Sequence, residues 1–64
     1  LDDIRYLIDT APGYLDPAGW LLLEHGWQQA ETVRGLLEQG GFTDVQSWRD
    51  LGGHQRVSGG RWHA

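Results

Sequence analysis

Cysteine and methionine are both absent from the 64 residues of this chain. Without thiols the chain cannot form a disulfide, a cysteine-ligated zinc or iron–sulfur site, or a cysteine nucleophile. Scaffolds of fewer than about 70–80 residues commonly depend on such a cross-link, because one small core supplies only about 3–5 kcal/mol. With no methionine before Leu1, we expect a matured peptide or a piece of a longer polypeptide. An independent enzyme with a large enclosed active site is therefore not expected.

Lysine is also absent, and nine acidic residues against five arginines give a net charge of −4. The arginines are scattered along the chain, whereas affinity for a phosphate backbone comes from a concentrated basic surface. No apolar run approaches the roughly 18 residues that a membrane span requires, and no secretory signal is present. We therefore expect neither direct binding to nucleic acid nor an association with membranes.

Two segments carry the apolar spacing of amphipathic helices. The first, residues 1–11, has apolar side chains at Leu1, Ile4, Leu7, Ile8 and Ala11. Pro12 interrupts this helix, and the sequence leaves open whether the proline breaks it or begins a short continuation over residues 12–15. In the second helix, apolar residues recur at Ala30, Val33, Leu36 and Leu37. Gly40-Gly41 follows and is expected to end that helix with a left-handed cap.

Three segments predict strands. Residues 20–23 form a continuous apolar run that is too short for a buried helix and is typical of a strand covered on both faces. Residues 42–50 have the β-branched and aromatic content of a strand, and residues 56–63 can return as its antiparallel partner. Gly59 and Gly60 in the last strand indicate a bulge or a close backbone approach.

The element order predicts an α/β fold with a three-stranded mixed sheet and a helix on each face. A strand, a crossover helix and a second strand place the two strands parallel, and the last strand adds in the antiparallel direction. The apolar strand at 20–23 is then left with an unpaired edge, which finished folds normally avoid. We therefore expect that a neighbouring strand is missing. For the isolated chain we expect marginal stability and self-association through Trp20, Leu21, Leu22 and Leu23.

The most specific stretch of the chain is Leu22-Leu23-Glu24-His25-Gly26-Trp27-Gln28-Gln29. It is preceded by Gly19-Trp20-Leu21 and followed by Val33-Arg34, Gly41-Phe42, Val45, Arg49-Asp50, Arg56-Val57 and Gly60-Arg61. In this order, these residues resemble the C-terminal end of the bacterial release-factor glutamine methyltransferases, the PrmC or HemK family. The resemblance covers almost the whole chain.

The resemblance implies that residues 1–64 are a single partial domain, the C-terminal portion of a Rossmann-like class I methyltransferase catalytic domain. The last three strands of its seven-stranded sheet would correspond to residues 20–24, 44–50 and 56–62, with the last strand inserted antiparallel between the other two. The cytoplasmic parent enzyme would use S-adenosylmethionine to methylate the glutamine of the Gly-Gly-Gln motif in peptide chain release factors. Its catalytic Asn-Pro-Pro-Tyr motif, its cofactor loop and its N-terminal helical domain have no counterpart here. The isolated chain is therefore expected to be inactive and to bind no cofactor.

Candidate site residues lie where the first strand ends, because ligand crevices in open α/β sheets lie outside the carboxyl ends of strands. An acid and a base at that point, Glu24 and His25, could hydrogen-bond a substrate amide. The predicted rim of a substrate crevice consists of Glu24, His25, Gly26, Trp27 and Gln29. The competing interpretation is a strand-end pair that only caps the next helix or meets water, with a tight turn at Gly26 and with Gln28 and Gln29 solvated.

The other aromatic and charged residues have structural interpretations. Trp20 is expected in the core, while Trp48 and Trp62 are expected to make cross-strand contacts. Asp50 and Arg56 flank the predicted turn of the hairpin and can pair across it, which would set the register more than the stability.

Two other functions stay open. The chain could be an autonomous module that binds a peptide along its open strand edge, or the C-terminal piece of another Rossmann-like methyltransferase. A metal site is not expected, because His25, His54 and His63 lack the spacing of metal ligands on a helix.

Overall fold

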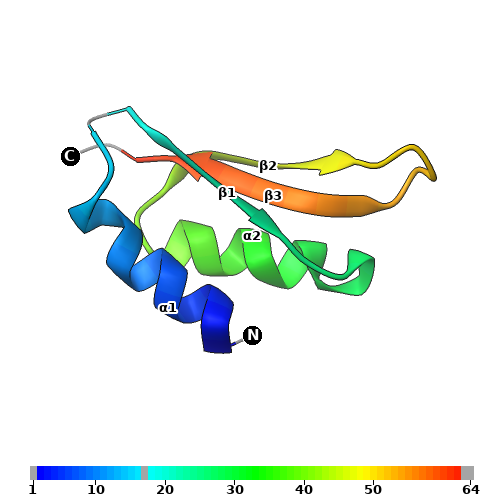
Figure 1. The fold of residues 1–64 in the computed structure, drawn as a ribbon, viewed down its shortest axis with the longest axis horizontal. Coiled ribbons are helices and arrows are strands. Elements are labelled where there is room, and N and C mark those ends of the chain that lie inside the picture. Colours follow the sequence, from blue (N-terminus) through cyan, green and yellow to red (C-terminus); the bar gives the residue numbers. More distant parts are fainter. Residues whose placement is uncertain (1, 17, 63–64) are drawn as a thin grey trace.

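The computed structural model describes residues 2–16 and 18–62. The predictions that involve Leu1, Pro17 and His63 lie outside the described residues. In chain order the elements are α1 (Asp2–Thr10), the short 3-10 helix η1 (Ala11–Gly13), β1 (Trp20–Glu24), the 3-10 helix η2 (Trp27–Gln29), α2 (Ala30–Gln39), β2 (Thr43–Arg49) and β3 (Gln55–Arg61). Figure 1 shows the three strands in one layer and the two α-helices in a second layer beneath it.

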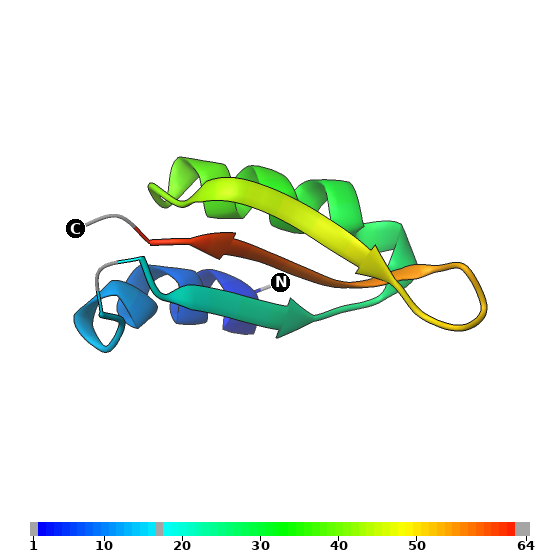
Figure 2. The ribbon, with the colours of Figure 1, turned by 90° about the horizontal axis from the view of Figure 1, so that it is seen from above.

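The strands form one sheet in the order β1-β3-β2, so the last strand lies between the other two. β1 pairs with β3 from Trp20 opposite Arg61 to Glu24 opposite Val57, and β2 pairs with the other edge of β3. Both pairings are antiparallel, and β1 and β2 run in the same direction without touching as neighbours (Figure 2). The α/β class and the inserted last strand are confirmed. The sheet itself is antiparallel rather than mixed, because β3 separates the two parallel strands.

Both α-helices pack on the same face of the sheet (Figure 1), so the prediction of one helix on each face is wrong. The buried core joins Ile8 of α1 to Val33 and Leu37 of α2, together with Leu23 and Phe42. No described strand precedes α1, so the handedness rule for crossovers does not decide its side of the sheet. The apolar stripe of α1 is instead buried beside α2.

The outer face of the sheet has no described helix on it. Along β1 the side chains alternate, so that Leu21 and Leu23 pack towards the core whereas Trp20 and Leu22 point away from it. Trp20 is 38% exposed and Leu22 is 59% exposed. The expectations of a strand covered on both faces and of a core position for Trp20 are therefore wrong for this chain, because the helices of residues 2–16 and 18–62 all lie in one layer. The second edge of β1 has no partner strand among residues 2–16 and 18–62.

The two α-helices end shortly before a proline and a glycine, respectively. α1 ends at Thr10, and Pro12 lies inside the 3-10 turn of η1, so the proline ends the α-helix while a helical turn continues. After α2, Gly41 has φ +94° and donates its N–H to the carbonyl of Glu38, which confirms a left-handed cap at this glycine. None of the helices that the structure describes has the length and apolar character needed to cross a membrane.

Candidate functional site

The predicted rim lies where β1 leaves the sheet, and two surface hollows meet there. One hollow, of about 380 Å³, separates the rim from the start of α1 and is lined by Asp2, Asp3, Ile4, Glu24, His25 and Gln29. The other, of about 370 Å³, faces the hairpin and is lined by Glu24, His25, Asp50, Arg56 and Val57. Glu24 and His25 border both hollows. The structure thus brings three of the predicted rim residues, Glu24, His25 and Gln29, around one concave surface.

The turn after β1 is closed by Gln29. The backbone N–H of Gly26 donates to the side-chain oxygen of Gln29 at 3.0 Å, and the N–H of Gln29 donates to the carbonyl of Gly26 at 2.9 Å. The first bond is one half of a capping box, in which the third helical residue caps the N–H before the helix; because glycine has no side chain, a backbone turn bond takes the place of the other half. The interpretation of Gln29 as a solvated first-turn residue is therefore wrong, whereas Gln28 is exposed as expected.

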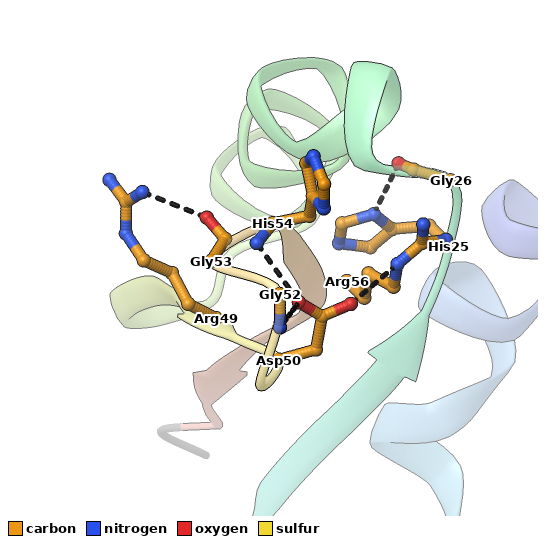
Figure 3. A network of polar contacts seen from close by, with 8 residues as sticks. All are labelled: His25, Gly26, Arg49, Asp50, Gly52, Gly53, His54 and Arg56. Atoms are coloured by element: carbon orange, nitrogen blue, oxygen red, sulfur yellow. Dashed lines mark hydrogen bonds and ion pairs between the residues drawn. The ribbon is translucent and has the colours of Figure 1, made fainter.

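The backbone N–H and both ring nitrogens of His25 make hydrogen bonds. Its backbone N–H donates to the carbonyl of Arg56 at 3.0 Å, which extends the β1–β3 ladder past the end of the strand. Its ring Nδ1 lies 2.8 Å from the carbonyl oxygen of Gly26, and its Nε2 lies 2.7 Å from the hydroxyl of Ser58 (Figure 3 shows the first of these contacts). Ser58 is absent from the predicted site. Its place in the last strand, on the face that packs on the core, could have indicated a role, because a buried hydroxyl requires a hydrogen-bond partner.

The hairpin between β2 and β3 folds beside this rim. The carboxylate of Asp50 accepts the backbone N–H groups of Gly52 and His54 at 2.9 and 3.0 Å (Figure 3). Its other oxygen accepts the Nε of Arg56 at 2.7 Å, so the predicted pair across the turn is confirmed. The N–H of His54 above all, together with the Arg56 guanidinium, holds the pKa of the Asp50 carboxyl below its usual value.

The indole of Trp27 also contacts the hairpin. Its ring lies at a tilt against the imidazole of His54, with 5.4 Å between the ring centroids, and the tryptophan is 49% exposed. Trp27, one of the predicted rim residues, therefore lies at the surface. The contact joins the start of η2 to the tip of the hairpin, so both sides of the second hollow are fixed relative to each other.

Acidic side chains dominate the hollow between the rim and α1. Asp2, Asp3 and Glu24 line it together with His25 and without an arginine, so it favours ligands that offer N–H groups or positive charge. The Glu24 carboxylate makes no hydrogen bond or ion pair with any residue of the described part of the chain. Residues 2–16 and 18–62 contain no cluster of three or more side chains suited to a metal ion. The arrangement can bind and orient an amide, by accepting its N–H groups.

Comparison with known proteins finds relatives that are similar to this segment. No model of a known protein family matches the chain. It is 52% identical over 60 residues to the release factor glutamine methyltransferase of Yersinia pestis and 52% identical over 62 residues to that of Pseudomonas aeruginosa. These matches cover 94% and 97% of the chain but 22% of each relative, so the chain spans about a fifth of their length. The resemblance of this segment to the release factor glutamine methyltransferases is therefore confirmed.

Proposed function

We propose that this chain is the C-terminal part of a protein-glutamine methyltransferase, in which it completes the sheet and forms one wall of the substrate crevice. The observation that carries the proposal is identity at about half of the residues, over nearly the whole chain, to proteins named release factor glutamine methyltransferase. The parent protein would transfer a methyl group from S-adenosylmethionine to the glutamine side chain in the Gly-Gly-Gln motif of a release factor.

The rim supports this role by its position and its charge. It follows the carboxyl end of β1, where open α/β sheets bind their ligands. A glutamine side chain offers two N–H donors, and the exposed carboxylate of Glu24 accepts such donors. Hydrogen bonds that involve a charged partner contribute about 1.5–3 kcal/mol. Glu24 would therefore orient the amide, and the reacting groups would come from the remainder of the parent.

The exposed outer face and the open edge of β1 fit the same proposal. Trp20, Leu22 and Trp48 are each more than a third exposed on a face without a described helix. In a parent protein about four times as long as this chain, other helices and a neighbouring strand would cover these surfaces. The chain alone would then lack the cofactor site and the catalytic groups.

A chimaera tests the proposal. The chain replaces the matching 60-residue segment of the Yersinia pestis relative, and methyl transfer from S-adenosylmethionine to a purified release factor is measured. We expect the activity to stay within about tenfold of the unaltered relative, which corresponds to about 1.4 kcal/mol of transition-state stabilisation. A chimaera that folds and binds the cofactor without transferring methyl groups would contradict the proposal.

Glu24→Gln in the chimaera tests the role of the rim. Loss of the charge is expected to lower kcat/KM for the release factor by about tenfold, mainly through KM, because the carboxylate would act in binding. The matched control is Glu38→Gln on the exposed side of α2, which should leave both constants unchanged. Equal effects of the two substitutions would refute a role for Glu24 in the crevice.

The cofactor assignment has its own test in the isolated chain. Because the cofactor would be held by the remainder of the parent, titration with S-adenosylmethionine should give no saturable NMR shifts. Saturable binding at micromolar concentration would show that the cofactor site lies within these 64 residues.

A second candidate function is favoured by the open edge of β1. An extended peptide could add to this edge as a further strand, as in modules that bind peptides by β-addition. In that case the chain would bind peptides by itself, and the chimaera that contains it would show no methyl transfer. An active chimaera together with no peptide binding by the isolated chain would decide for the methyltransferase.

A further inference from the structure

A line of hydrogen-bonded side chains crosses the core side of the sheet and ends at the rim. Ser58, on the central strand β3, is fully buried, and its hydroxyl lies 2.7 Å from Nε2 of His25 and 2.6 Å from the hydroxyl of Ser47. The Nη1 group of Arg34, on α2, donates to the hydroxyl of Ser47 at 2.6 Å and to the side-chain oxygen of Gln55 at 3.1 Å. We refer to Arg34, Ser47, Ser58 and His25 as the relay. It joins α2, both strands of the hairpin and the end of β1.

The groups at the two ends of the relay determine which group donates and which accepts in each of its hydrogen bonds. A guanidinium can only donate, so the Ser47 oxygen accepts from Arg34. A carbonyl can only accept, so the ring contact with Gly26 requires a proton on Nδ1 of His25. In a neutral ring, Nε2 then accepts, and Ser58 must donate its one hydroxyl hydrogen to it. Ser58 is left to accept from Ser47, which completes the relay with every hydrogen used once.

We propose that Ser58 is a positioning residue: through the relay it holds His25 as the Nδ1–H tautomer and thereby fixes the turn that carries the rim. Both ring nitrogens of His25 are then engaged within the chain, so the imidazole shapes the crevice and does not exchange protons with a substrate. Glu24 is left as the rim group that meets a ligand. The tautomer itself does not depend on which substrate the parent protein uses, so this inference can fail or hold separately from the proposed function.

The tautomer can be read directly. We would label the histidines of the 64-residue chain with ¹⁵N and record long-range proton–nitrogen NMR spectra in alkaline buffer, where imidazoles are neutral. Signals of His25 are assigned by their loss in His25→Asn. In the unsubstituted chain we expect a protonated Nδ1 and an unprotonated Nε2. A protonated Nε2 at His25 would overturn the proposal by itself, without any further variant.

Ser58→Ala tests the cause. Without the donor from Ser58, Nε2 is free to carry the proton, and the fraction of the Nε2–H tautomer should rise at least severalfold. Thr10→Ala is the control, because it removes a hydroxyl that bonds to the carbonyl of Tyr6, outside the relay. An unchanged tautomer in folded Ser58→Ala would overturn the proposal. If this variant of the isolated chain does not fold, the same comparison is made in the chimaera, where the remainder of the relative supports the sheet.

Discussion

The indole rings of Trp20 and Trp48 meet edge to face on the outer side of the sheet, with 6.4 Å between their centroids. The two residues belong to β1 and β2, which are not neighbours, because β3 lies between them. Their partners on β3 are Arg61 and Val57, and the outward position between these two is Gly59. Gly59 adds no side chain to this part of the outer face. Aromatic pairs of this geometry contribute about 0.5–1.5 kcal/mol beyond the burial of their area.

Gly59→Ala is expected to destabilise the fold by about 1–3 kcal/mol. A Cβ at this position would lie 2.5 Å from the backbone oxygen of Leu21 and 2.6 Å from a methyl group of Leu22, so the strands must shift. The control is Gly35→Ala in α2, where a Cβ meets no atom within 4 Å and alanine should stabilise the helix by about 0.5–1 kcal/mol. Urea unfolding of both variants measures the two effects. Equal free energies of unfolding would show that Gly59 is not required for close packing.

Leu22→Lys is expected to reduce self-association of the isolated chain. Leu22 is 59% exposed beside the open edge of β1, and charges on edge strands oppose pairing with another molecule. Translational diffusion of the unsubstituted chain should slow as its concentration rises, whereas that of the variant should stay nearly constant. Leu51→Lys is the control, since Leu51 is fully exposed in the hairpin turn, away from that edge. Association that responds equally to both substitutions would exclude the β1 edge as the contact.

Asp50→Asn is expected to destabilise the hairpin at neutral pH and to have little effect in acid. The folded-state pKa of Asp50 is lowered, so the stabilisation by its carboxylate is fully present above the ordinary value of 3.8 and is lost as the pH falls through the folded-state pKa. Urea midpoints of the two proteins should therefore differ at neutral pH and converge in acid. Glu38→Gln, an exposed carboxylate on α2, serves as the control. A difference between Asp50→Asn and the unsubstituted chain that persists unchanged in acid would disprove the assignment.

Gln29→Ala is expected to loosen the rim, at a cost of about 0.5–2 kcal/mol, the usual range for a lost helix cap. The substitution leaves the N–H of Gly26 without its acceptor. The neighbouring Gln28→Ala is the matched control, because the side chain of Gln28 is exposed and makes no hydrogen bond within the described part of the chain. Faster amide hydrogen exchange at Gly26 in the first variant alone would verify the prediction. Equal exchange in both variants would argue that Gln29 does not close the turn.

Much of the site can be predicted from the end of one strand. Glu24, His25 and Gln29 are close in sequence, so placing the end of β1 correctly also places these residues around one hollow. Their partners could not be placed in this way. Ser58 is 33 residues beyond His25, and its contact with the imidazole depends on the register between β1 and β3. A shift of one residue would turn Ser58 to the other face of the sheet.

The sequence by itself determined which segments form the two α-helices and the three strands, that the last two strands form a hairpin, and which proteins this segment resembles. Side-chain spacing, turn residues and short specific stretches act over a few positions, so they are legible without a structure. Only the tertiary structure decided that α1 lies beside α2, that Trp20 and Leu22 face outward, and that His25 is tied to Ser58. Each of these outcomes depends on contacts between elements distant in the chain, whose relative free energies no local pattern encodes.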